Sequence, residues 1–233
     1  MGSAEQQTID DRLYEKWKQW IERIYDETVA LFAYRSFYRG LAEITEANEE
    51  IPPTSFFDAL GAWYATTQAM AVRRQTDTGA DAVSLAKLLV NMGVHPHVMN
   101  RDRFLSLWGD EEHWQMRGSE QFDKYVGDGG DQIAKEYYEA DLERFQRTAQ
   151  PIKDYVDRLV AHNDQRELSR LPTWAELNDA IDLLEEMLNK YMVLLKATSV
   201  PSADPVHQED WKAAFRVPWL RERVNPRRRR DGR

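Results

Sequence analysis

Two side chains four residues apart have the types needed for chemistry on a phosphodiester. If the chain around Arg158 and His162 is α-helical, the two lie on the same face, because residues four apart are neighbours on a helix surface. An imidazole can move the proton of a ribose 2′-hydroxyl or of the leaving group, while a guanidinium stabilises the charge on the phosphate. This pairing points to RNA cleavage. In the structural alternative, His162 only caps the helix end and Arg158 pairs with Asp154.

A second group of polar residues could bind a phosphate without cleaving it. Arg73 and Arg74 are followed by Asp77, and Ser84 then opens another helix. Backbone N–H groups at a helix start favour anions, and guanidinium groups bind phosphate oxygens in pairs. The alternative is that these arginines end the preceding helix, where their charge is favourable to its dipole.

The sequence predicts no metal and no cofactor. It contains no Gly-rich phosphate loop, no nucleophile elbow and no HExxH pair. The chain has no Cys, which excludes disulfides, thiolate nucleophiles and iron–sulfur clusters. His95-Pro96-His97 is interpreted as a solvated loop, and the carboxylates of 136–143 as a solvated helix face.

Charge is distributed unevenly along the 233 residues. The net charge is -9, yet residues 221–233 carry seven Arg against Glu222 and Asp231. An acidic body discourages broad wrapping of nucleic acid, and the basic tail is the exception. No apolar segment approaches the ~20 residues of a membrane-spanning helix, so we expect no membrane contact. The absence of Cys fits a reducing cytosol, and we expect a cytoplasmic location.

Helical periodicity predicts the elements that position these groups. A long first helix runs from about residue 9 to about 40, with an apolar stripe of Leu13, Trp17, Trp20, Ile24 and Leu31. A second helix opens at Ser55, and its buried side is predicted to contain Phe56, Leu60, Trp63, Tyr64 and Met70. A third, short helix contains Leu85, Leu88, Leu89 and Met92, and Gly93 with Pro96 closes it.

The second half of the chain continues the helical pattern after one interruption. A fourth helix is predicted over 98–108, and the Gly- and Asp-rich stretch 109–130 is predicted to be a long loop. Further helices are expected over 131–149 and from Pro151 to His162. Thr173 and Glu176 form a capping box before a long last helix, whose apolar stripe comprises Leu177, Ile181, Leu184, Leu188, Tyr191 and Leu195. The fold class is therefore all-α: a single helical bundle with long first and last helices.

The order of these segments resembles that of the HEPN abortive-infection proteins of the AbiU-like group. The similarity spans roughly residues 10–220 and is carried by residues 73–77, 84–89, 158–164, 177–191 and 211–219. The resemblance implies a HEPN-like helical domain over 9–220, between a disordered N-terminus (1–8) and a disordered basic tail (221–233). It also implies a prokaryotic phage-defence setting and a homodimer. Many HEPN proteins are metal-independent ribonucleases, and the resemblance assigns the catalytic roles to Arg158, His162 and Asp164.

Three functions follow from these observations. The general HEPN motif has four to six residues between Arg and His, whereas three residues separate Arg158 from His162. That difference favours a module that binds RNA or a nucleotide, with Arg73, Arg74 and Asp77 as phosphate-binding residues. One alternative is a metal-independent endoribonuclease or toxin that uses Arg158 and His162. The other is a structural or protein-interaction bundle.

Overall fold

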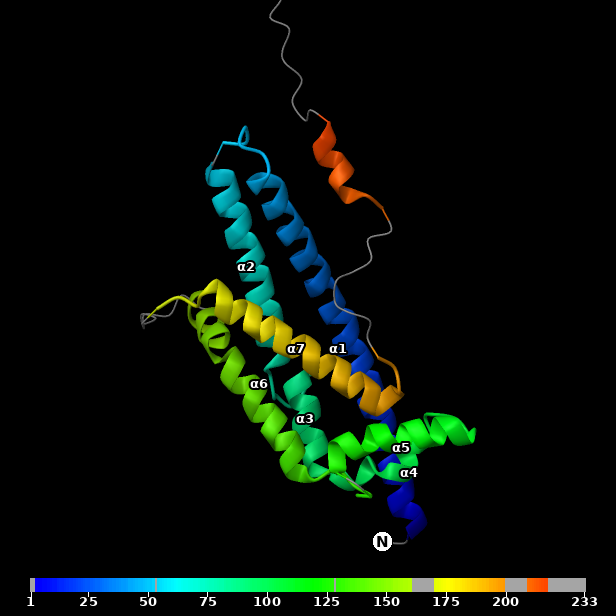
Figure 1. Ribbon diagram of the computed structural model, residues 1–233. Coiled ribbons are helices and arrows are strands. Elements are labelled where there is room, and N and C mark those ends of the chain that lie inside the picture. The colour runs from blue at the N-terminus through cyan, green and yellow to red at the C-terminus, as the bar shows by residue number, and fades with distance from the viewer. Residues whose placement is uncertain (1–2, 53, 128, 161–169, 200–208, 218–233) are drawn as a thin grey trace, which may run out of the picture.

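The computed structural model describes residues 3–52, 54–127, 129–160, 170–199 and 209–217, and they form an all-α bundle (Figure 1). Within these residues no strand forms, and a single antiparallel bridge joins Asn100 to Gln132. The helices in chain order are α1 (Ser3–Glu46), α2 (Ser55–Gln75), α3 (Leu85–Val94), η1 (Pro96–Val98), α4 (Arg101–Leu105), α5 (Glu112–Val126), α6 (Lys135–Tyr155), η2 (Val156–Val160), α7 (Trp174–Lys196) and η3 (Trp211–Arg216). The expected fold class is confirmed.

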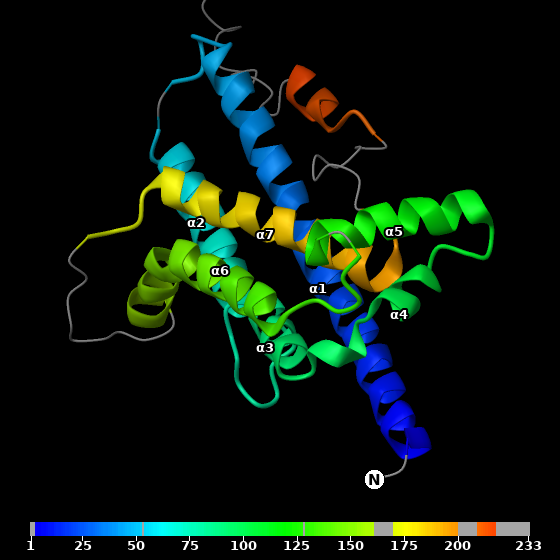
Figure 2. The same ribbon diagram turned by 60° about the horizontal axis from the view of Figure 1, so that its bottom comes forward.

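The core lies where α3, α6 and α7 pack against the first half of α1. α6 lies between α3 and α7, and α7 crosses α1 and α2 (Figures 1 and 2). The C-terminal half of α1 and the N-terminal half of α2 extend beyond this core as a helical hairpin, with η3 beside α1 (Figure 1). Several large apolar side chains of this hairpin, among them Tyr34, Phe56 and Trp63, are exposed within the part of the chain that the structure describes.

Local signals correctly located three of the main helices. In α1, Trp17 and Ile24 are fully buried, and the Trp17 indole donates to the Asn91 side chain on α3 at 2.6 Å. The four predicted apolar residues of α3 are buried, and Ser84 caps that helix by accepting from the Lys87 amide at 3.0 Å. The Thr173–Glu176 capping box is present, and all six stripe residues of α7 are buried.

Three boundaries differ from the sequence pattern. α1 already begins at Ser3, so residues 3–8 are helical rather than disordered, and Gln6 donates to Asp10 one turn later. The stretch 109–130 contains α5 rather than the expected long loop. Gly118 lies inside this helix and allows it to pack closely, since a Cβ at this position would lie 2.9 Å from the Trp108 side chain. α6 continues through Pro151 and passes into the π-helical turn η2, where separate helices were expected.

The largest difference concerns which side of α2 faces the core. The buried residues of α2 are Gly61, Gln68, Ala69, Ala71, Val72 and Gln75. Three of the residues predicted to be buried are exposed instead: Phe56 by 57%, Trp63 by 63% and Met70 by 45%. α2 is apolar on two faces, and periodicity alone cannot tell which of them the core covers.

Candidate functional site

The end of α2 and the turn after it hold the first group of candidate residues. Thr76 caps α2, and its hydroxyl donates to the Arg73 carbonyl at 2.7 Å. The turn closes through Ser84, whose hydroxyl donates to the Asp77 carbonyl, and through the Gln75 side chain, which accepts from the Leu85 amide at 3.0 Å. These bonds fix the backbone that carries Arg73 and Asp77.

The second group begins where α6 becomes π-helical. η2 spans Val156–Val160 and contains Arg158, which is half-buried, while Val156 faces the core. π-helical turns widen the helix by one residue per hydrogen bond and are frequent at functional sites. The α-helical geometry assumed for the pair of Arg158 and His162 is therefore not the backbone found at Arg158. His162 and Asp164 lie outside the described residues.

Arg73 and Asp157 join the two groups. The Arg73 guanidinium donates through Nε to Asp157 Oδ1 at 2.7 Å, and through Nη1 to Asp77 Oδ2 at 3.2 Å. Lys153 Nζ donates to the other oxygen of Asp157 at 2.6 Å. The end of α2 is thus fastened to η2, and a phosphate would have to compete with two carboxylates for Arg73.

The pKa values of these groups reflect this network. Burial raises the pKa of Asp157, but the hydrogen bonds from Lys153 and Arg73 outweigh it and leave that pKa below its ordinary value. The pKa of Asp77 is lowered first by the hydrogen bond from the Gly79 amide and then by Arg73. The hydrogen bond to Asp157 raises the pKa of the Arg73 guanidinium. All three side chains therefore stay charged near neutral pH.

Arg74 follows Arg73 at the end of α2, and Arg158 follows Asp157 in η2. Arg74 is exposed at the end of α2, which packs against η2. Within the described part of the chain, neither Arg74 nor Arg158 forms an ion pair. Asp154, the alternative partner considered for Arg158, accepts instead from the Gln150 side chain at 2.8 Å. The structure thus brings Arg73 and Asp77 beside Asp157, the residue before Arg158, as neither sequence motif by itself indicated.

Sequence reasoning missed Asp157 and Lys153 as members of this group. Their spacing of four residues on one helix was a visible signal for an ion pair.

Sequence reasoning also missed the structural role of Asp141, which was assigned to a solvated helix face. Asp141 is only 9% exposed and accepts from Lys190 Nζ and the Tyr191 hydroxyl, both at 2.6 Å. Among the described residues, no group of three His, Asp or Glu side chains could hold a metal ion.

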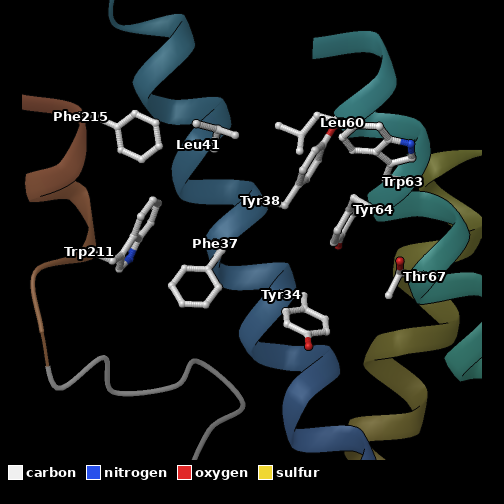
Figure 3. Close-up of a pocket in the computed structure, with 10 residues that line it drawn as sticks. All are labelled: Tyr34, Phe37, Tyr38, Leu41, Leu60, Trp63, Tyr64, Thr67, Trp211 and Phe215. Carbon is white, nitrogen blue, oxygen red and sulfur yellow. The ribbon is translucent and has the colours of Figure 1, made fainter. Parts of the chain in front are cut away.

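A second concave feature, here called the aromatic groove, lies on the α1–α2 hairpin. Its volume is about 550 Å³, its floor belongs to α1, and α2 and η3 form its walls (Figure 3). Among the described residues, no charged side chain lines it; the lining residues are Tyr34, Phe37, Tyr38, Leu41, Leu60, Trp63, Tyr64, Thr67, Trp211 and Phe215. Such a lining suits an apolar occupant and offers nothing to hold a phosphate.

η3 is held against α1 by a few specific contacts. The Phe37 and Trp211 rings meet edge to face with centroids 5.2 Å apart, and Lys212 Nζ donates to Glu43 at 2.9 Å. The Trp211 ring approaches the α1 backbone at Gly40, where a Cβ would lie 2.6 Å from the ring. η3 buries none of its own residues completely, so it forms a wall of the groove without filling it.

Comparison with known proteins identifies the family of the chain. The sequence profile of HEPN AbiU2 matches residues 14–214, which include Arg73, Arg74, Asp77 and Arg158 and every lining residue of the aromatic groove except Phe215. No curated protein and no solved structure gave a match. No helix in the described residues is long and apolar enough to cross a membrane. The family match extends over most of the chain, and the protein is therefore a member of the HEPN AbiU2 family of abortive-infection-related HEPN domains.

Proposed function

We propose that this HEPN AbiU2 protein takes part in phage defence by binding RNA or a nucleotide at the surface formed by the end of α2 and by η2. The observation that carries this proposal is the Arg73–Asp157 ion pair, which places Arg74 and Arg158 on adjoining elements. Guanidinium groups are the side chains best suited to phosphate, because their paired N–H donors match its oxygens.

Some cationic side chains of this surface are engaged in ion pairs within the protein, whereas others are left to bind an anion. Asp157 engages Arg73 and Lys153, so these two cations mainly hold α2, α6 and η2 together. The positive charge that remains for an anion comes from Arg74 and Arg158. In a chain with a net charge of -9, such a local site predicts contact with a short segment of RNA rather than wrapping along a strand.

Binding of fluorescently labelled single-stranded RNA to the full-length chain tests this function. Arg158→Ala and Arg74→Ala should each weaken binding about tenfold, because each removes one charged hydrogen-bonding group from a phosphate. Each should also lower the dependence of affinity on salt, since fewer counterions are released. Arg12→Ala is the matched control: Arg12 is exposed on α1, away from the end of α2. Equal affinity of wild type and Arg158→Ala would contradict the proposal.

The same preparation addresses the alternative of a metal-independent endoribonuclease. That reaction would use His162 to move protons and Arg158 to stabilise the phosphate, and a chelator should not stop it. The readout is the length of the RNA after incubation with wild type and with His162→Ala. A cut that wild type makes and His162→Ala does not would assign the enzyme. Binding without a cut supports the module proposed here.

A further inference from the structure

We propose that a small pocket between α2, α6 and the start of α7, here called the base pocket, binds one unpaired nucleobase of the RNA. This inference rests on the proposed function and deepens it, because it adds recognition of a base to recognition of the phosphates at the end of α2 and at η2. It also specifies the ligand as single-stranded RNA, since a base that is paired and stacked inside a duplex cannot enter a pocket.

The base pocket lies where the last turn of α6 and the first turn of α7 approach α2 (Figure 1). Two alanines of α2, Ala65 and Ala69, line one side, and Tyr155 of α6 and Trp174 of α7 are among the other lining residues. Within the described part of the chain, no charged side chain lines the pocket, whose volume is about 210 Å³. An apolar cavity of about 150 Å³ is large enough to bind benzene. The base pocket is therefore large enough for one planar ring system and too small for a helix of a partner protein.

The rim of the base pocket exposes large apolar side chains. Trp174 is 50% exposed, and Leu171, which also lines the pocket, is 62% exposed. Bases of single-stranded RNA stack on aromatic side chains, and every base has the flat π surface that this contact requires. A base in the pocket would remove part of the exposed apolar surface of Trp174 and Leu171 from water, which is favourable.

The ring of Trp174 is held in position by its neighbours. It lies within 16° of parallel to the rings of Tyr38 and Tyr64, with centroid distances of 5.9 and 6.0 Å. The backbone that leads into Trp174 is fixed by the capping box, in which the Thr173 amide donates to Glu176 Oε2 at 2.8 Å. A wall that is already ordered loses little conformational entropy when a ligand binds, so it suits a binding site.

Two polar groups of the lining residues favour a nucleobase over an aliphatic chain. Among the described residues, none forms a hydrogen bond with the Tyr155 hydroxyl or with the Trp174 indole N–H. The hydroxyl can donate or accept, and the indole can donate. Every base has acceptors on its edges, as ring nitrogens or carbonyl oxygens. A hydrocarbon chain would shield both groups from water without replacing the hydrogen bonds that water makes.

The base pocket adjoins the ion pair that joins α2 to η2. Ala69 precedes Arg73 by four residues, so Arg73 lies about 6 Å farther along the same side of α2. Tyr155 is the last residue of α6, two before Asp157, and Asp157 accepts from Arg73 at 2.7 Å. Since a single ribose separates a base from its own phosphate, a base in the pocket would place that phosphate near η2, where Arg158 follows Asp157.

Two oligomers of equal length separate the contribution of the base from that of the phosphates. One is single-stranded oligoadenylate, and the other has the same ribose–phosphate backbone without bases. The full-length wild type should bind oligoadenylate about tenfold more tightly, because stacking of one base contributes an affinity of this order. Fluorescence anisotropy of the labelled oligomers measures both dissociation constants. Equal affinity of wild type for the two oligomers would overturn the base pocket.

Ala65→Leu tests whether the preference for bases depends on this pocket. A leucine side chain would occupy space inside the pocket, so the affinity for oligoadenylate should fall to that for the oligomer without bases, which should itself not change. Ala62→Leu is the matched control, because Ala62 is exposed on the same helix and does not line the pocket. A folded Ala65→Leu variant that keeps the wild-type preference would overturn the proposal.

Substitutions of Trp174 give the same test if Ala65→Leu does not fold. Trp174→Ala removes the stacking surface and should abolish the preference for oligoadenylate. Trp174→Phe retains an aromatic ring and should keep most of the preference. A merely structural role of Trp174 would change the affinity for both oligomers alike. Equal preferences of wild type and Trp174→Ala would contradict a base stacked at this position.

Two further measurements separate failure of the base pocket from failure of the proposed function. Arg158→Ala should weaken binding of both oligomers by the same factor, because it removes a contact to phosphate. If it does so while wild type shows no preference for bases, the RNA function stands and the base pocket is wrong. Adenosine carries no phosphate, and equilibrium dialysis should show that wild type binds it and Ala65→Leu does not. Binding of adenosine by a chain that binds neither oligomer would refute the RNA function and leave the pocket; no binding of adenosine to wild type would refute the pocket.

Discussion

Arg73 and Asp157 are 84 residues apart in the sequence, and their side chains form an ion pair of 2.7 Å that fastens the end of α2 to η2. Asp157 also accepts from Lys153, one turn earlier on α6. The carboxylate is partly buried and joins three elements, so its loss affects more than a surface charge pair.

Removal of this carboxylate should destabilise the protein. In Asp157→Ala, Arg73 and Lys153 lose their shared partner, and we expect the free energy of unfolding to fall by about 1–2 kcal/mol. Urea denaturation followed by circular dichroism measures the change. Glu27→Ala is the control, since it removes an exposed pair with Arg23 and should cost less than about 0.5 kcal/mol. Equal effects of the two variants would contradict the role given to Asp157.

The buried carboxylate Asp141 should be more costly to remove. It accepts from Lys190 and from the buried Tyr191 hydroxyl, and burial raises the pKa of Tyr191 well above its ordinary value. Asp141→Ala leaves both donors without this acceptor, and we expect a loss of about 3 kcal/mol in the free energy of unfolding. Glu139→Ala, on the exposed side of α6, removes only a surface pair with Lys135 and serves as the control. A loss below about 1 kcal/mol for Asp141→Ala would show that the network contributes little.

Acid should weaken the start of α7. Hydrogen bonds from Arg170 and then from the Thr173 amide lower the pKa of Glu176 from 4.5 to about 2. Because the folded-state pKa is the lower one, the stabilisation is complete above about pH 4.5 and is lost as the pH falls toward 2. Glu176→Gln should therefore lose less stability than wild type over this interval of pH. Thermal denaturation at a series of pH values measures it, with the exposed Glu49→Gln as control, which should follow wild type.

The contact between Gly40 and Trp211 can be measured by combining two substitutions. In an ordinary helix, Gly→Ala stabilises by about 0.5–1 kcal/mol, but a Cβ at Gly40 would collide with the Trp211 ring. We therefore expect Gly40→Ala to stabilise the Trp211→Ala variant and to give little or no gain in wild type. The free energies of unfolding of the four proteins give the coupling. A gain of the same size in both backgrounds would show that η3 does not rest on α1 at this point.

Most helices of this protein follow from the sequence itself, because their signals are local. The spacing of Trp17 and Ile24 identifies α1, Ser84 and Thr173 cap α3 and α7, and the order of segments indicates the HEPN AbiU2 family. The sequence prediction of helix boundaries was wrong where a residue type occurs both inside helices and at their ends. Gly118 resembles a loop residue but allows α5 to pack closely against Trp108, and Pro151 suggests a helix start but lies inside α6.

Tertiary structure alone decided which groups meet. The apolar residues Phe56, Trp63 and Met70 predict a covered face, but only packing shows that α7 and α6 cover the other face of α2 and leave this one to solvent. Arg73 and Arg158 each suggested a phosphate site on separate helices. These two helices meet at the Arg73–Asp157 ion pair, which joins residues far apart in the sequence where α2 packs on α6 and η2. Periodicity reports that a face is apolar or charged, whereas the partner of that face is set by the arrangement of the whole chain.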